Sequence, residues 1–223
     1  MTSSPRIVVL SAPSGGGKTT IARAVRDRYP DRFGFSVSAT TRKPRAREKD
    51  GVDYRFWKPS QFLNGVKQGQ FLEHAEYSGE LYGTLRSDVE DILKSGRHVL
   101  LDIEVHGAEQ VRKLAPDAIT IFILPSNPRV LTERLVKRGS ESPEEIQQRL
   151  ERAIYELSHA THFHRWIRND DLDEAVNAVV KAADERTEKL MRDRHDYAWL
   201  NRYLGDLQLE KQRLYDELHQ QKG

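Results

Sequence analysis

Ten residues near the N-terminus combine the side chains and the backbone freedom that phosphate binding requires. The stretch SAPSGGGKTT, residues 11–20, follows the apolar run 7–10 and precedes a helical pattern that begins at Ile21. Glycines let backbone N–H groups turn towards a phosphate, and the following helix adds its positive dipole end. Lys18 supplies a mobile charge for the β- and γ-phosphates, and the Thr19 hydroxyl can bind Mg²⁺. The pattern predicts a phosphate-binding loop made by Ala12, Pro13, Ser14, Gly15, Gly16, Gly17, Lys18, Thr19 and Thr20.

The loop departs at one position from the usual pattern G-x-x-x-x-G-K-[ST], because Ala12 replaces the first glycine. Alanine is tolerated there only if the backbone keeps a negative φ. The alternative, a glycine-rich turn without a ligand, is disfavoured by the strand pattern before it and the helix pattern after it.

A second apolar run, residues 99–103, ends in the acids Asp102 and Glu104. In proteins with such a loop, a strand of this kind lies beside the loop's own strand, and its terminal acid faces Mg²⁺ or the phosphate acceptor. The alternative is an ordinary strand end with solvated acids. Arginines also cluster in segment 40–47 and recur at Arg134, Arg138 and Arg149. Guanidinium groups bind phosphate oxygens in pairs, so these clusters favour a small polyanion as ligand.

Composition limits the class of protein. The 223 residues predict one domain, with a subdomain or tail at most, and no apolar run reaches the length of a membrane span. The 36 basic side chains nearly balance the 34 acidic ones, which argues against a nucleic-acid binder. There are no cysteines, and the residues before the first strand are too few for a signal peptide. We therefore expect a cytoplasmic protein that binds neither nucleic acid nor membrane.

Strand and helix patterns alternate along most of the chain. Short apolar runs predict strands at 6–11, 98–103 and 119–124, and helices are expected near 17–29, 86–95, 106–114, 127–138 and 143–160. This alternation indicates an α/β fold with a parallel sheet flanked by helices. Residues 33–85 break the rhythm with short β-like pieces and many aromatic residues, which indicates an insertion between core elements.

Several segments resemble the signature motifs of guanylate kinases. They are FGFSVSATTRKPR at 33–45, DGVDY at 50–54, FLE at 71–73, YGT at 82–84, DIEVHG at 102–107 and NDD at 169–171, in the family's order and spacing. The resemblance covers roughly residues 5–185. It implies a P-loop NTPase core with a small mixed β insertion that binds GMP, and a helical lid. The expected domain spans 1–190: core 5–32 and 86–126, insertion about 33–85, lid about 127–160, and core return 161–190.

The resemblance implies transfer of the γ-phosphoryl group of ATP to GMP, and to dGMP as a second acceptor, with Mg²⁺ accompanying ATP. Arg42, Arg45, Tyr54 and Tyr82 would hold the GMP phosphate, while Ser38, Glu73, Thr84 and Asp102 would read the base. Arg134, Arg138 and Arg149 match the lid arginines, which would act on the transferring group together with Lys18 and Arg42. Asn169 matches the segment that borders the adenine of ATP. His106 departs from the family, which more often has glutamine there.

The chemistry of these residues supports the assignment separately. Guanine presents two neighbouring N–H donors and one oxygen acceptor. A carboxylate such as Glu73 accepts from both donors, and a hydroxyl such as Ser38 can donate to the oxygen. Adenine would leave a buried carboxylate unpaired, which discriminates strongly against it. Two alternatives remain: a kinase of another small phosphate acceptor, such as a ribose bisphosphate, or a guanylate-kinase-like module that binds partners without catalysis.

Residues 191–223 extend past the family's usual end. Their apolar residues recur in alternating steps of three and four, which predicts a helix with one apolar stripe: Tyr197, Leu200, Leu204, Leu207, Lys211, Leu214 and Leu218. Three interpretations are open: a helix docked on its own domain, a coiled coil between subunits of a homo-oligomer, or a disordered tail.

Overall fold

The computed structural model describes residues 4–46, 48–77, 79–136, 143–185 and 194–220. Its contacts divide the chain into two compact units. The first comprises Met1–Leu10 and Ala22–Thr120, and the second comprises Ser11–Ile21 and Ile121–Gly223. Within the described residues, no helix is long and apolar enough to cross a membrane.

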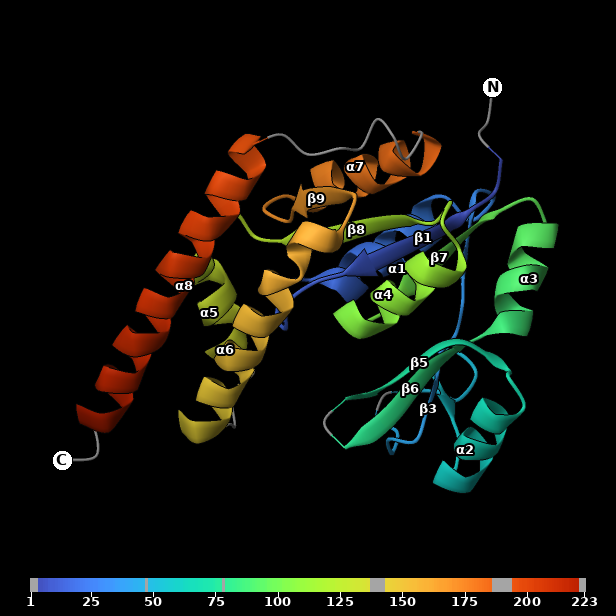
Figure 1. Ribbon diagram of the computed structural model, residues 1–223, viewed down its shortest axis with the longest axis horizontal. Coiled ribbons are helices and arrows are strands. Elements are labelled where there is room, and N and C mark those ends of the chain that lie inside the picture. Colours follow the sequence, from blue (N-terminus) through green and yellow to red (C-terminus); the bar gives the residue numbers. More distant parts are fainter. Residues whose placement is uncertain (1–3, 47, 78, 137–142, 186–193, 221–223) are drawn as a thin grey trace. The chain divides into compact units, whose positions relative to one another are not determined.

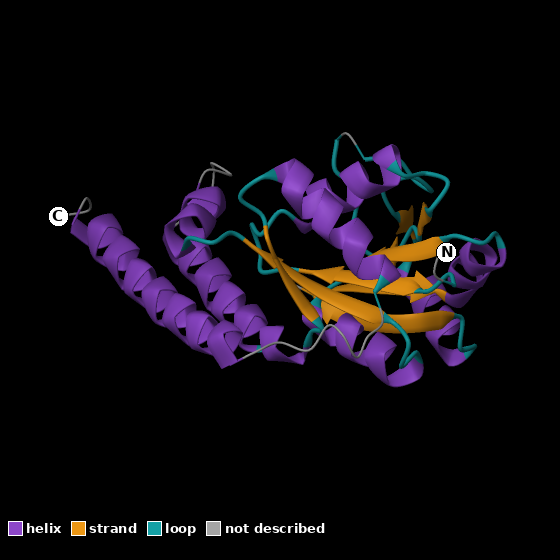
Figure 2. Ribbon diagram, turned by 90° about the horizontal axis from the view of Figure 1, so that it is seen from above, coloured by secondary structure: helices purple, strands orange, loops and turns teal. Residues whose placement is uncertain are grey.

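The larger sheet has the strand order β2-β7-β1-β8-β9. Its strands are β1 (Ile7–Ser11), β2 (Phe33–Phe35), β7 (His98–Asp102), β8 (Ile119–Leu124) and β9 (Arg165–Arg168). β7 pairs in parallel with both β1 and β2, and β8 pairs in parallel with β9. Every residue of β1 and β8 is buried, as their continuous apolar runs predict. The predicted class, a parallel sheet with flanking helices, is confirmed (Figures 1 and 2).

Phe33–Phe35 belongs to the larger sheet, although the sequence pattern places it at the start of the insertion. Phe33 pairs with His98 and Phe35 with Leu100, so β2 extends the core sheet beyond β7. The strand is only three residues long, and its position follows from this pairing rather than from its own pattern. The small sheet begins after it.

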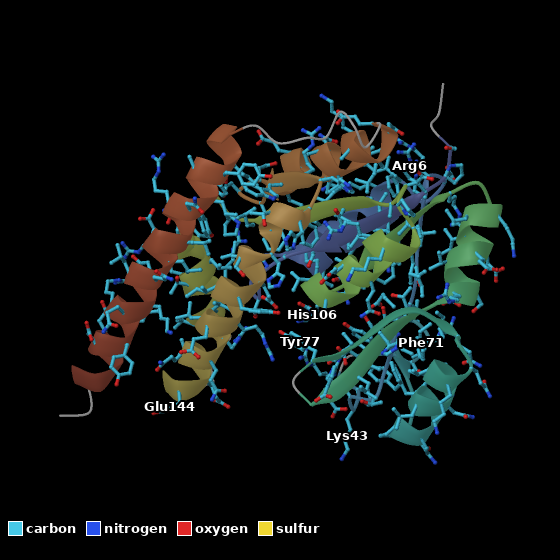
Figure 3. All side chains as sticks on the ribbon, in the orientation of Figure 1. Arg6, Lys43, Phe71, Tyr77, His106 and Glu144 are labelled. Carbon is cyan, nitrogen blue, oxygen red and sulfur yellow. The ribbon has the colours of Figure 1, made fainter. Side chains whose placement is uncertain are left out.

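The smaller sheet lies wholly in the first unit and has the order β4-β3-β6-β5. It contains β3 (Ala39–Thr40), β4 (Arg55–Phe56), β5 (Phe71–Tyr77) and β6 (Glu80–Leu85), and helix α2 (Pro59–Lys67) covers it. Phe62 of α2 stacks on Phe71 of β5 with ring centroids 4.4 Å apart. Phe71 is labelled in Figure 3. With Ala39 and Leu85, these rings form a separate small core that fixes the sheet.

Five further helices lie close to the ranges that the sequence predicts. They are α1 (Lys18–Arg28), α3 (Arg86–Lys94), α4 (Val105–Leu114), α5 (Pro128–Val136) and α6 (Pro143–Ser158). A short 3₁₀ turn, η1 (Ala160–His162), and α7 (Leu172–Asp184) complete the return to the core. In the first unit α3 packs on β7 and α4 on β5, and in the second α7 packs on β9.

The last helix, α8 (Arg194–Gln220), docks on α5 and α6 of its own unit (Figures 1 and 2). Leu200, Tyr203 and Leu207 are buried in this contact, and Lys211 pairs with Glu151 of α6 at 2.8 Å. The first of the three interpretations of the apolar stripe therefore describes the structure. The Leu218 side chain lies outside the described residues.

Candidate active site

The loop between β1 and α1 has the backbone geometry that its glycines predict. Gly15 and Gly17 have φ angles of 83° and 89°, which side chains rarely allow. The Gly16 N–H donates to the Pro13 carbonyl at 2.8 Å, closing a tight turn, and α1 begins directly afterwards at Lys18. The loop therefore leads into a helix N-terminus, the arrangement that binds phosphate.

Two close approaches explain the small residues of this loop. A side chain at Gly17 would place its Cβ 2.0 Å from Nδ2 of Asn169, and that amide donates to the Gly16 carbonyl at 2.7 Å. A Cβ at Gly16 would lie 2.9 Å from the Cβ of Ala12. Ala12 is buried, so the alanine in place of the usual glycine fills space that Gly16 leaves free.

Helix α6 holds the same loop through Ser14. The buried carboxylate of Glu156 accepts a hydrogen bond from the Ser14 N–H at 2.8 Å. Arg149, two turns earlier on α6, donates to the Ser14 hydroxyl at 3.4 Å and to the Leu135 carbonyl at 3.3 Å. Sequence reasoning missed Glu156, because a glutamate in a helical pattern reads as a solvated side chain. A signal was present in its spacing of seven from Arg149, which places both on one helix face.

Arg134 and Asn169 connect α5 with the loop. The Arg134 guanidinium donates to the Asn169 carbonyl at 3.3 Å. Asp170 accepts from the Ser126 backbone N–H at 2.9 Å and from the Ser126 hydroxyl. Arg134, Arg149 and Asn169 thus lie around the phosphate-binding loop. Their roles towards ATP, which for Asn169 is contact with the adenine, stay predictions. Arg138 lies outside the described residues.

In the first unit, Glu73 is a carboxylate with 4 % exposure held inside the small sheet. The Thr84 hydroxyl, on the neighbouring strand β6, donates to Glu73 Oε1 at 2.6 Å. Gly107 of α4 approaches so closely that a Cβ there would lie 2.4 Å from Glu73 Oε2. Two of the residues predicted to read a base therefore touch, and Gly107, which was not singled out for this role, makes room for the carboxylate.

Arg42 is held on one side by Glu48 and on the other by aromatic rings. Its guanidinium donates to Glu48 at 2.9 Å and lies 5.4 Å from the centre of the Tyr54 ring. Tyr54 meets Tyr82 edge to face at 5.9 Å. The hydrogen bond to Glu48 raises the pKa of Arg42, and the same bond lowers the pKa of Glu48. Three of the residues predicted to bind a phosphate thus form one cluster.

Glu48 also orders the fourth member of that set. The Arg45 backbone N–H donates to Glu48 Oε2 at 2.8 Å, while the Arg45 side chain is exposed. Sequence reasoning missed Glu48, because its partners are fixed by a loop that no periodic pattern describes. One carboxylate therefore holds the Arg42 side chain and the Arg45 backbone.

The other predicted base-side residues lie at strand ends in the same unit. Ser38 is half-buried directly before β3, and Asp102 is half-buried at the end of β7, where its backbone is in register with Leu10 of β1. His106 is exposed in the first turn of α4 (Figure 3). Further along α4, the Gln110 side chain bonds both the N–H and the carbonyl of His74, at 3.2 and 2.8 Å, and so fixes α4 on β5.

Thr19 is the residue predicted to meet a metal ion, and it is exposed in the first turn of α1. The described residues contain no group of three or more His, Cys, Asp or Glu side chains that could hold a metal ion by themselves. A single hydroxyl fits Mg²⁺ carried by a nucleotide, because that ion keeps several waters and binds phosphate oxygens readily.

A parallel α/β core with a glycine-rich phosphate loop, together with a small sheet carrying an acid and an arginine cluster, defines a P-loop phosphotransferase. Comparison with known proteins narrows this class. The family model described as "Guanylate kinase" matches residues 4–186. The chain therefore belongs to the guanylate kinase family, whose members are nucleoside monophosphate kinases that transfer phosphate from ATP to GMP.

Individual guanylate kinases are similar to this chain over most of their own length. The guanylate kinase of Thermus thermophilus is 48 % identical over 188 residues, covering 83 % of this chain and 84 % of the relative. That of Chlorobium chlorochromatii is 48 % identical over 180 residues, covering 80 % of this chain and 94 % of the relative. A crystal structure of guanylate kinase from Anaplasma phagocytophilum is 30 % identical with a TM-score of 0.66, covering 85 % of this chain and 95 % of that one.

Proposed function

We propose that this chain phosphorylates GMP, and dGMP as a second acceptor, with ATP as donor. The residues around the phosphate loop bind ATP, and those of the small sheet and the Arg42 cluster bind GMP. The observation that carries the acceptor assignment is the buried Glu73 carboxylate with Thr84 at 2.6 Å. A buried acid in this position suits a base with adjacent N–H donors, which guanine has and adenine lacks.

On the donor side, the loop of residues 12–20 binds the phosphates of ATP through Lys18 and through those of its backbone N–H groups that have no acceptor within the chain. Arg134 and Arg149 reach the same loop and neutralise charge on the transferring phosphoryl group, and Arg138 is assigned the same role from its position in the sequence. Asn169 fixes the loop backbone next to the nucleotide. Mg²⁺ bound with ATP would supply charge neutralisation on the phosphates, with the Thr19 hydroxyl as the chain's own ligand.

On the acceptor side, Arg42, Arg45, Tyr54 and Tyr82 hold the GMP phosphate. Ser38, Glu73, Thr84 and Asp102 bind guanine. The acceptor phosphate is already an anionic nucleophile near neutral pH, so the chain needs no strong general base. Catalysis follows from alignment and charge neutralisation, with Arg42 aiming the acceptor oxygen. Guanine is common to GMP and dGMP, and none of these roles requires a 2′-hydroxyl, which supports dGMP as a second acceptor.

The test is ADP release from ATP and Mg²⁺ with GMP, dGMP, AMP, CMP and UMP offered in parallel. We expect turnover with GMP and dGMP alone. Lys18→Met should lower kcat by on the order of a hundredfold or more while the melting temperature stays the same, because Lys18 acts on the phosphates. Folded wild-type chain that turns over none of these nucleotides would favour a kinase of another small phosphate acceptor or a non-catalytic binding module. Near-normal turnover of Lys18→Met would contradict the role of the loop.

A further inference from the structure

Strand β5 carries Glu73, and its pairing with β6 is irregular just before that residue. Phe71 is in register with Leu85 of β6, and Glu73 with Thr84, so Leu72 is an extra residue on β5. Side chains of a regular strand alternate between its two faces, so Phe71 and Glu73 would otherwise share a face. A bulge with one extra residue allows the two side chains to face opposite sides of the sheet.

The two sides of the small sheet differ in chemistry. Phe71 stacks on Phe62 of α2 in the small apolar core. A Cβ at Gly83 of β6 would lie 2.6 Å from a ring carbon of Phe71, so Gly83 faces the same core. The next residue, Thr84, faces the other side, where its hydroxyl donates to Glu73. The bulge therefore takes the Glu73 carboxylate away from the apolar core.

Helix α4 packs on β5 and contacts it through two residues that lie about one turn apart. Gly107 lies against the Glu73 carboxylate, since a Cβ there would be 2.4 Å from Oε2. Gln110 follows three residues later, on the same helix face. The His74 N–H donates to Gln110 Oε1 at 3.2 Å, and Gln110 Nε2 donates to the His74 carbonyl at 2.8 Å. One face of α4 thus contacts two consecutive residues of β5.

The two Gln110 bonds take the place of a further strand. β5 is the last strand of the small sheet, so β6 pairs with it on one side only. In an antiparallel pair, the N–H and C=O groups of every second residue point away from the partner strand. His74 presents both groups to the Gln110 amide. The bonds therefore fix the backbone of β5 two residues after Leu72, where the pairing with β6 is interrupted.

We infer that Gln110 is a positioning residue for base recognition: by holding His74, it sets where the neighbouring Glu73 carboxylate meets guanine. The inference rests on the proposed function, in which Glu73 accepts from the two adjacent N–H donors of guanine. Two parallel hydrogen bonds require the carboxylate at one place and angle, whereas a single bond tolerates a displacement. Loss of Gln110 therefore weakens GMP more than a ligand that donates to Glu73 only once.

The test is Gln110→Met, which keeps the length of the side chain without either hydrogen bond. We expect the KM for GMP to rise about three- to tenfold, with kcat and the KM for ATP within about twofold of wild type. Inosine monophosphate (IMP) lacks the 2-amino group of guanine, so its inhibition constant should rise less than the KM for GMP. In a Glu73→Gln background, Gln110→Met should not raise the KM for GMP further, because it acts through that carboxylate.

Three further variants separate positioning from other effects. Gln110→Asn keeps the amide on a side chain one carbon shorter, which cannot reach both groups of His74, so it should repeat the pattern of Gln110→Met. Gln61→Met, at an exposed position of α2, should behave as wild type. Val25→Ala leaves a cavity at a fully buried position of the same unit. It should lower the melting temperature without changing the ratio of the IMP inhibition constant to the KM for GMP.

An unchanged KM for GMP in Gln110→Met, an equal loss for GMP and IMP, or an effect that multiplies with that of Glu73→Gln would each overturn the inference. Wild-type chain that neither binds nor phosphorylates GMP would overturn the proposed function together with it. Wild type that is active on GMP, with a Gln110→Met variant that keeps the wild-type KM, would overturn the inference alone.

Discussion

The Glu73 carboxylate is held by Thr84 on one side and approached by Gly107 on the other. Glu73→Gln keeps the size of the side chain but places an NH₂ donor where guanine also donates. We expect the KM for GMP to rise on the order of tenfold to a hundredfold, while the KM for ATP changes less than about twofold. Steady-state kinetics with each substrate varied in turn measures this.

Glu76→Gln is the matched control for that experiment, because Glu76 is on the same strand but exposed. It should leave both KM values as in wild type. A Glu73→Gln chain with an unchanged KM for GMP would show that this carboxylate does not read the base, whatever the outcome for overall activity.

Glu48 holds the Arg42 guanidinium and the Arg45 backbone at once. Glu48→Gln removes the charge of that bond, so we expect the KM for GMP to rise about three- to tenfold with little change for ATP. Because the pair lowers the pKa of Glu48, its stabilisation is present above the ordinary value of 4.5 and is lost as the pH falls through the lowered value.

Melting temperatures of wild type and Glu48→Gln across pH 3 to 8 test the sign of this dependence. The difference between the two melting temperatures, called the gap below, should be constant near neutral pH and should disappear at the acid end. Glu90→Gln, which removes an exposed pair with Lys94, should give no gap at any pH. A gap that widens with acid would contradict the ion pair as its source.

At the scale of elements, the Glu156–Ser14 bond ties α6 to the phosphate loop. Glu156→Ala leaves the Ser14 N–H without its acceptor, which costs about 1–3 kcal/mol and loosens the loop. We expect a lower melting temperature and a KM for ATP raised severalfold, measured by thermal unfolding and kinetics. Glu156→Gln should recover most of the ATP affinity, because an amide oxygen can accept the same bond.

The exposed Glu145, on the same helix, provides the comparison for Glu156→Ala. Glu145→Ala should match wild type in both measurements. Equal losses of GMP and ATP affinity in Glu156→Ala would indicate general destabilisation in place of an effect on the loop.

The same scale shows which elements a sequence can predict. Strands β1, β7 and β8 were predicted because each is a short, continuous apolar run that is buried in the sheet. Strand β9, with the sequence RWIR, has no such run, and it exists because it pairs with β8. The two-residue strands β3 and β4 likewise depend on partners far along the chain. Periodicity predicts elements that carry their own burial pattern, and tertiary pairing decides the others.

The residues of the candidate site likewise fall into those that the sequence predicts and those that it does not. Ser14, Gly15, Gly16 and Gly17 were predicted from a motif whose spacing reflects backbone geometry, and the φ angles of Gly15 and Gly17 agree. Glu156 was missed because the fold brings Ser14 to it from far along the chain, and Glu48 because its partners lie in a loop that no periodic pattern describes. The family resemblance was confirmed, whereas the role of each residue stays a prediction until the variants are measured.

At the scale of the whole molecule, the docking of α8 bears on self-association. The centre of the apolar stripe that a coiled coil would need is covered by α5 and α6, since Leu200 and Leu207 are buried there. Leu209 is 71 % exposed, but the residues around it on the outer face, such as Asp206 and Gln208, are polar and exposed. A single exposed leucine is normal on a protein surface and does not by itself make an interface.

We therefore expect a monomer of 25.7 kDa by light scattering coupled to size exclusion, with a mass independent of concentration in the micromolar range. Leu209→Lys should leave that mass unchanged, because the prediction assigns no partner to the outer face of α8. A mass of twice this value that falls to the monomer in Leu209→Lys would place a subunit contact on that face. A doubled mass that persists in the variant would place it elsewhere, and in either case the monomer prediction would be wrong. The inner face of α8 would still be committed to α5 and α6, because exposing Leu200 and Leu207 to reach a second copy would cost their burial, about 1.5–3 kcal/mol each.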